Sequence, residues 1–203
     1  SLQPGSYMSL ADTRGTLVPP GTYELWLIAG SDSLRQTLMV KADPRWPFPA
    51  EDLHAQYQLA VNCRELLDKA HGALGQLREV RKQVAQTLGY ARKQRLTVKP
   101  ILMGEALIDS LSTLEKELIQ TQNESRQDPI NYPSMLDDQI AYLYSTVNQQ
   151  DARPTEGCYQ RYQDLEAKLA PKLKRLSQLM NEAIPILESE LEAAGAPRIW
   201  REE

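Results

Sequence analysis

One long stretch decides the fold: residues 50–94 read AEDLHAQYQLAVNCRELLDKAHGALGQLREVRKQVAQTLGYARKQ. Its apolar residues recur mostly in alternating steps of three and four, at Leu53, Tyr57, Ala60, Cys63, Leu67, Ala70, Leu74, Leu77, Val84 and Leu88. This spacing gathers them along one face of an α-helix. At about 1.5 Å per residue the helix would be roughly 65 Å long. A helix of that length with a single apolar stripe must pack on other helices.

Three further helical segments follow, and we expect them at about residues 100–124, 134–149 and 155–194. The segment at 134–149, the third of the four helices, opens with Ser134 and Asp137 in capping-box spacing. Pro171 and Pro185 fall inside the fourth, which predicts a kink or break at one or both. The short link at residues 151–154 makes the last two helices antiparallel neighbours. Residues 50–203 therefore predict an elongated antiparallel bundle of about four helices.

Residues 1–49 have a different character and predict β-structure. Thr22–Ala29 and Leu34–Lys41 read as the two strands of a hairpin connected by Gly30–Ser33. Apolar side chains occupy both faces, so both sides need cover. Residues 1–17 could add only one or two short strands, for example around Ser6–Leu10, and a lone hairpin is marginal in water.

We therefore expect a partial Ig-like or fibronectin-like β-sandwich, with its other strands upstream in a longer precursor or in another chain. Residues 43–49, DPRWPFP, form a stiff extended connector to the helices. The chain begins at Ser1 with a turn-rich segment, so we interpret it as a processed product or a fragment. The fold class is α+β, mainly α, with domains at 1–49 and 50–203.

Composition excludes several functions. The 203 residues carry a net charge of -4, and nucleic-acid-binding modules usually show a basic face. Apolar residues make up 41% of the chain, but no stretch approaches 18 of them in succession, so no transmembrane segment is expected.

The few metal-ligand and thiol residues predict no site. His54 and His71 are 17 positions apart on the first helix, about 25 Å along its axis, and cannot share a metal. Cys63 and Cys158 are too few and too distant for a zinc site. They remain open to three interpretations: buried thiols, a disulfide joining the first and fourth helices, or a reactive thiol.

Charged residues are abundant, and we interpret them as solvated helix faces. The acids considered as acid/base pairs are Glu115, Glu117, Asp137, Asp138, Glu188, Glu190 and Glu192. The basic run comprises Arg78, Arg81, Lys82, Arg92, Lys93 and Arg95. Glycosidase chemistry needs two carboxyls across a cleft, and acids on a polar helix face meet the sequence condition for such a pair by accident. The basic run lacks the interleaved aromatics of a nucleic-acid-binding surface.

Two further features could be either packing or binding sites. Tyr142, Tyr144, Tyr159 and Tyr162 cluster around the turn between the last two helices. The polar, proline-bearing segment from Gln122 to Leu136 connects two helices, and we expect Asp128 and Asn131 to bond to local backbone in it. No catalytic, cofactor-binding or metal-binding residue is assigned, and no cofactor is expected.

Three ordered stretches carry a family resemblance: VPPGTYELWLIAG…LMVKADPR, QDPINYP…LDDQIAYLYSTV and DARPTEGCYQRYQDLEAKL. They resemble the C-terminal region of large secreted bacterial proteins of the sortilin-like, BNR-repeat class, which carry the name glycosyl hydrolase. In that family a β-propeller precedes an Ig-like module, and a helical tail follows. This chain has no room for a propeller at 40–50 residues per blade, and Cys158 stands where the pattern has Ala.

The resemblance implies an extracytoplasmic setting. It places any hydrolase site in the propeller and transfers no catalytic residue to this chain. The resulting hypothesis is a non-enzymatic scaffolding or protein-association module whose partner is an upstream propeller or sandwich part, or another chain. The alternatives are an accessory domain that shapes the substrate cleft of a propeller hydrolase, with an aromatic-lined pocket, and a self-associating helical module that forms homo-oligomers.

Overall fold

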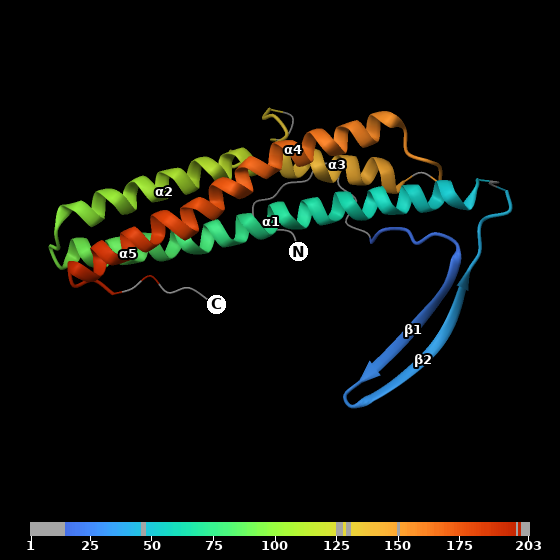
Figure 1. The fold of residues 1–203 in the computed structure, drawn as a ribbon, viewed down its shortest axis with the longest axis horizontal. Helices are drawn as coiled ribbons and strands as arrows, with labels where there is room; N and C mark the ends of the chain where they lie inside the picture. Colours follow the sequence, from blue (N-terminus) through green and yellow to red (C-terminus); the bar gives the residue numbers. More distant parts are fainter. Residues whose placement is uncertain are drawn as a thin grey trace.

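The computed structural model describes residues 15–45, 48–124, 128, 131–149, 151–197 and 199. A two-stranded antiparallel hairpin precedes a rod of packed helices (Figure 1). The described residues show the hairpin without further strands, so a sandwich is not part of this structure. The strand considered at Ser6–Leu10 lies outside the described residues.

The hairpin consists of β1 (Gly21–Ala29) and β2 (Asp32–Val40), paired without a break from Gly21 opposite Val40 to Ala29 opposite Asp32. Its loop has two residues, Gly30 and Ser31, and is shorter than the predicted connection. Gly30 has φ of +63°, whereas Ser31 has no positive φ. This is the pattern of a type II′ turn, which fits the twist of paired strands.

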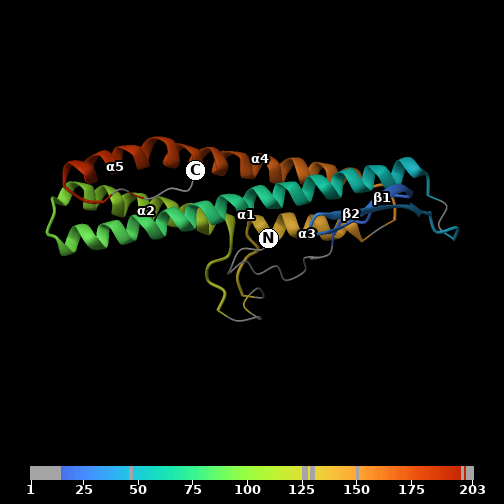
Figure 2. The ribbon, with the colours of Figure 1, turned by 90° about the horizontal axis from the view of Figure 1, so that it is seen from below.

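Helix α1 (Ala50–Lys93) runs the length of the rod and packs against α2, α3 and α4, the three longest of the helices that follow (Figure 2). Its C-terminal half lies beside α2 (Val98–Leu118) and its N-terminal half beside α3 (Leu136–Asn148). The chain then returns along the rod through α4 (Glu156–Gln178), the π-helical segment η2 (Leu179–Ala183) and α5 (Ile184–Ala193). The predicted bundle is confirmed.

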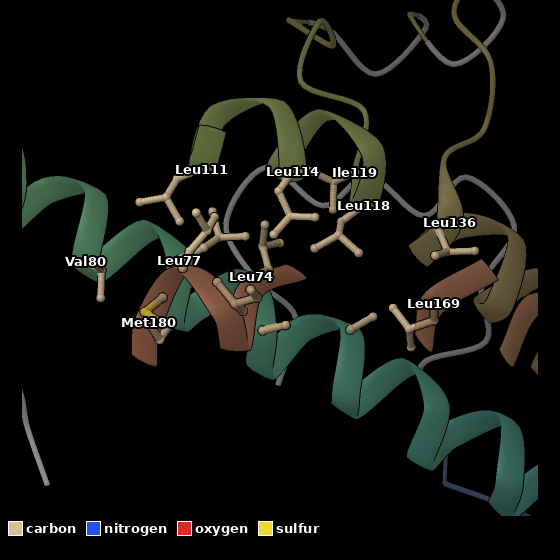
Figure 3. Close-up of a cluster of buried hydrophobic side chains, with 14 of the residues drawn as sticks. Leu74, Leu77, Val80, Leu111, Leu114, Leu118, Ile119, Leu136, Leu169 and Met180 are labelled. Carbon is tan, nitrogen blue, oxygen red and sulfur yellow. The ribbon is translucent and has the colours of Figure 1, made fainter. Parts of the chain in front are cut away.

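The core follows the predicted stripe of α1 from Ala70 to Leu88, whereas nearer the start of the helix Leu59 and Leu66 are buried and the predicted Leu53, Tyr57 and Leu67 are half-buried. Leu74 and Leu77 of α1 meet Leu111 and Leu118 of α2, and Met180 of η2 covers them (Figure 3). All five are buried. The apolar face of each helix thus finds its cover within the rod, which is why these sequences stay helical.

Two local predictions need correction. The second helix ends at Leu118 rather than Glu124. The capping box at Ser134 and Asp137 is wrong: α3 begins at Leu136 without a side-chain cap, and the carboxylate of Asp137 accepts the adjacent N–H of Asp138.

The two prolines of the last helix behave differently. Pro171 lies on the exposed side of α4, which continues through it. Pro185 is the second residue of α5 and is separated from η2 only by Ile184. Because Pro185 has no N–H to offer the preceding turn, the wider π-helical turn accommodates it without ending the helical path.

Candidate functional site

The hairpin carries the largest group of exposed apolar side chains in the described structure. Strand alternation and register place one set on a common face, here called the leucine face: Tyr23, Leu25, Leu27, Leu34, Gln36, Leu38 and Val40. All except Gln36 are apolar or aromatic. Leu27 and Leu34 lie directly opposite each other and are 66% and 70% exposed.

The opposite side, here called the mixed face, combines apolar and charged residues: Thr22, Glu24, Trp26, Ile28, Ser33, Arg35, Thr37 and Met39. Arg35 Nη1 donates to Glu24 Oε1 at 3.1 Å. The guanidinium of Arg35 also stands 5.7 Å from the centre of the Trp26 ring, within range of a cation–π interaction. Both the Trp26 ring and the Arg35 side chain nevertheless remain more than half exposed.

No helix packs extensively against either strand among the described residues, and Figure 1 shows the hairpin standing away from the rod. Each strand pairs on one side only, so its outer edge keeps unpaired backbone groups. Exposed edges of this kind are templates for pairing with another strand. The sequence predicted apolar side chains on both faces of the hairpin, each needing cover, and both faces are exposed among the described residues.

The segment leading into the hairpin is attached to α3. Asn148, buried near the end of that helix, accepts the N–H of Leu17 at 3.0 Å through Oδ1. Its Nδ2 donates to the carbonyl of Gly15 at 3.4 Å. Nothing in the sequence analysis singled out Asn148. The available signal was its position four residues after Tyr144, where the buried stripe of α3 continues with a polar residue.

Apart from the hairpin, a cavity lies between α3 and the start of α4. It has a volume of about 470 Å³ and is lined among others by Ser134, Asp138, Tyr142, Cys158 and Arg161. Arg161 Nη2 donates to the side chain of Gln139 at 2.8 Å at its margin. A pocket near the tyrosine cluster was the feature expected of a cleft-shaping domain.

The four tyrosines do not form one patch. Tyr142 is exposed and lines this cavity. Tyr144 is buried in the core. Tyr159 and Tyr162 are half-buried and pack against this core. Packing therefore accounts for three of the four, and Tyr142 is available for a ligand.

The two histidines lie far apart along α1, as predicted, and His71 is buried. His54 is exposed and contacts the carbonyl of Ala50 through Nδ1 at 2.7 Å. His71 Nε2 lies 3.6 Å from Asp137 Oδ2 inside the rod. Neither atom has a hydrogen-bond partner among the described residues.

Both cysteines are free thiols, which the sequence left open. Cys63 is buried in α1, and this burial, with a smaller contribution from Cys158, raises its pKa to about 12. Cys158 is half-buried, and its Sγ lies 3.4 Å from Thr155 Oγ1. A thiol with so high a pKa stays protonated near neutral pH and is a poor nucleophile.

The interpretation of Arg78 and Arg81 as part of a solvated face is wrong. Arg78 Nε donates to Glu115 Oε1 at 2.6 Å, and Arg81 pairs with the other carboxylate oxygen. Glu115 is buried, so this ion-paired cluster joins α1 to α2. The sequence missed it because the three residues are adjacent only after the helices pack.

Asp137 is buried, so its interpretation as part of a solvated helix face is wrong as well. Several other charged residues are exposed at least in part and pair across the surface. Glu117 accepts from Lys172 at 2.6 Å, and Arg92 pairs with Glu105. Glu190 pairs with Lys99. These contacts join neighbouring helices, which agrees with the interpretation of these acids as parts of polar helix faces.

The connection between α2 and α3 is described in part, at residues 119–124, 128 and 131–135. As predicted, Asp128 organises it: its carboxylate accepts the N–H of Glu124 at 2.5 Å. Its carbonyl accepts the N–H groups of Asn131 and Tyr132 at 2.8 and 3.1 Å. Asn131 contributes through its backbone.

Within the described ranges, no three His, Cys, Asp or Glu side chains come together as a metal site. None of the described helices is both long and apolar enough to cross a membrane. Comparison with protein-family models, with curated proteins and with solved structures gives no match to this chain. The family resemblance therefore remains a prediction.

Proposed function

We propose that this chain is a non-catalytic scaffolding and protein-association module: a helical rod that presents a β-hairpin to a partner. The observation that carries the proposal is the pair of nine-residue strands whose large apolar side chains and outer edges are open to solvent. Exposed apolar surface of this kind marks association sites. A hairpin this apolar gains stability only when another surface covers it.

The rod is suited to hold the hairpin at a fixed place. The core runs through α1, α2, α3, α4 and α5, so the helices form one continuous support. Asn148 fixes the chain just before β1 to this support. The module would therefore position whatever binds the hairpin relative to the rod.

The identity of the partner is inferred from the family resemblance. We propose that it is the β-rich sandwich or propeller part of a secreted protein, carried by the same polypeptide or by another chain. An extracytoplasmic location follows from the same resemblance. In this account any hydrolase chemistry resides in the propeller.

The test compares the full 203-residue sequence with a variant that lacks residues 1–49, each placed in its natural protein context. Native mass spectrometry with peptide identification should find the β-rich partner with the complete sequence. The shortened variant should lose a partner that is a separate chain, or, where the same polypeptide carries the partner, should release it once the connection between the two parts is cleaved by limited proteolysis. It should keep its helical circular dichroism and cooperative melting. Retention of the partner by the shortened variant would contradict the proposal.

The cavity beside Tyr142 favours a second function, that of an accessory domain shaping a substrate cleft. An exposed aromatic ring with Asp138 and Arg161 nearby is suited to small polar ligands. Crystals soaked with soluble oligosaccharides test this function. Density stacked on Tyr142 would support it, and a Tyr142→Ala variant with unchanged saccharide affinity would oppose it.

A self-associating module is the third reading, and it has its own surface. Val98 and Leu102 are exposed at the start of α2, at the end of the rod remote from the hairpin. Sedimentation velocity over a hundredfold range of concentration tests this reading. A constant monomer would remove it, whereas a dimer lost in Leu102→Glu would support it.

A further inference from the structure

We infer that the leucine face is the side of the hairpin that becomes buried, and that its partner is a β-rich unit with both an open strand edge and an apolar sheet face. This inference rests on the proposed function and specifies the surface and the partner that it involves. The mixed face stays in contact with water. The sequence pattern alone suggested cover on both faces.

The charges of the hairpin distinguish its two faces. Glu24 and Arg35 form an ion pair whose side chains are more than half exposed. Covering the mixed face would remove both charges from water, and the desolvation penalty of such a pair can exceed its attraction. The guanidinium of Arg35 also lies 5.7 Å from the centre of the Trp26 ring, so a partner that covered this half-exposed ring would have to desolvate the charge beside it.

The leucine face carries no comparable penalty. Its central polar residue, Gln36, is neutral, and Asp32 lies at the turn end of the same side. The leucines around Gln36 are exposed, with Leu25 directly opposite it. Burying the leucine face therefore yields apolar burial without the loss of a solvated ion pair.

The dimensions of the hairpin argue against a second copy as the occupant. Two nine-residue strands cover a footprint of about 30 Å by 10 Å, or roughly 300 Å². A stable interface usually buries about 800 Å² on each partner. The accessible area of the face exceeds this flat footprint because side chains stand out of the sheet, but one face of a single hairpin is still small for such an interface. Face-to-face packing of two hairpins also leaves their edges open.

Edge-to-edge pairing of two copies fails for a different reason. It would join two hairpins into one sheet whose leucine face is twice as large and still uncovered. A β-rich unit with an incomplete sheet meets both needs, because its edge strand pairs with β1 or β2. Its second layer then covers the leucine face at the usual spacing of about 10 Å.

The strands are suited to such addition. No proline interrupts residues 21–40, so every residue of either strand retains its N–H. Main-chain pairing would supply affinity, and alternate side chains of the leucine face would supply specificity, as in other cases of strand addition.

Site-specific photocrosslinking tests the inference in the native protein particle. The crosslinking residue p-benzoylphenylalanine replaces Leu27 or Leu34 on the leucine face, and Ile28 or Met39 on the mixed face as matched controls. The four positions are 66%, 70%, 72% and 65% exposed, so accessibility alone predicts equal yields. Peptide mapping by mass spectrometry identifies the attachment sites.

The inference predicts crosslinks from Leu27 and Leu34 to alternate residues of an apolar strand outside residues 1–203, at least tenfold above those from Ile28 and Met39. Equal yields from both faces, or crosslinks to a second hairpin, would overturn the inference and leave hairpin-mediated association intact. No crosslink outside this chain from any of the four positions would overturn the proposed function as well.

Variants that introduce charges on one face or the other provide an independent readout. Leu27→Lys with Leu34→Glu should reduce partner retention at least tenfold, while Ile28→Lys with Met39→Glu should change it less than twofold. The opposite ranking would contradict the assignment of the faces. Helical circular dichroism serves as the folding control, because the core of the rod includes none of these four residues.

Discussion

Asn148 accepts the N–H of Leu17 at 3.0 Å and thereby connects the end of α3 to the chain that enters the hairpin. The two residues are 131 positions apart in the sequence. The side chain of Asn148 also reaches the carbonyl of Gly15, so it contacts the entering chain at two points. A buried polar residue of the rod thus holds the chain shortly before β1 begins at Gly21.

Replacing Asn148 with Ala should loosen this attachment. One net intramolecular hydrogen bond contributes about 0.5–1.5 kcal/mol, so we expect a loss of about 1 kcal/mol in the free energy of unfolding. The Leu17 amide should exchange hydrogen faster. Urea denaturation and exchange mass spectrometry measure both effects. Gln58→Ala is the control, because its side-chain bond to Asn62 is exposed; an equal loss in both variants would refute the special role of Asn148.

Gly104 lies where α2 packs tightly against α1. A Cβ on this residue would lie 2.6 Å from Leu88 Cδ2, and Leu88 is itself buried. Gly104→Ala should therefore destabilise the rod by about 1–3 kcal/mol through overpacking, despite the better helix propensity of Ala.

The control for Gly104 is Gly72→Ala in α1, where a Cβ would meet no atom within 4 Å. That substitution should stabilise by up to about 1 kcal/mol. Thermal unfolding of both variants provides the comparison. A stabilised Gly104→Ala variant would show that the two helices are not in such close contact.

The cluster of Glu115 with Arg78 and Arg81 should contribute measurably to stability. Glu115→Gln keeps the shape but removes the charge that the two guanidinium groups share. Because both arginines are partly exposed and can be rehydrated, we expect a loss of about 1–2 kcal/mol. Glu105→Gln, which breaks a half-exposed pair with Arg92, should cost less than about 0.5 kcal/mol. Similar effects in denaturant titrations would contradict the importance assigned to burial.

Cys63 should respond to alkaline pH. Burial raises its pKa from 9.0 to about 12, so the fold favours the neutral thiol. The associated stability is complete below about pH 9 and is lost as the pH rises toward 12. The pKa of Tyr162 is also raised to about 12, chiefly by burial, and contributes to the same range. Denaturant titrations at several alkaline pH values measure the slope of the free energy of unfolding against pH. The difference in this slope between the wild type and Cys63→Ala isolates the thiol, and identical slopes would contradict the pKa assignment.

The reactivity of the two thiols gives a second check. At pH 8 a thiol reagent such as dithionitrobenzoate should modify the half-buried Cys158 well before the buried Cys63. Denaturation should equalise the two rates. Faster modification of Cys63 in the native protein would show that the interior is accessible.

The helical part of the fold was largely predictable because its signal is local. The stripe containing Leu74 and Leu88 identified α1, and these residues are buried as predicted. The two strands were also placed to within two residues at each end. Their turn was predicted too long because Gly30 alone supplies the positive φ that a two-residue loop requires.

The functional features were harder to predict because they depend on contacts between distant segments. Glu115 looked like any exposed acid until α1 and α2 packed together. His71 and Asp137 meet in the same way, across α1 and α3. The difference between the two hairpin faces also needed the pairing register, which brings Arg35 next to Glu24 and Trp26.

Hydrogen exchange of the hairpin amides tests the central claim most directly. In the 203-residue chain alone, the amides of residues 21–40 should exchange within seconds, because an isolated two-stranded hairpin is marginal in water. In the native particle the same amides should be protected at least a hundredfold, while those of α1 remain protected in both samples. Equal exchange of the hairpin in the two samples would show that no partner covers it and would contradict the association function.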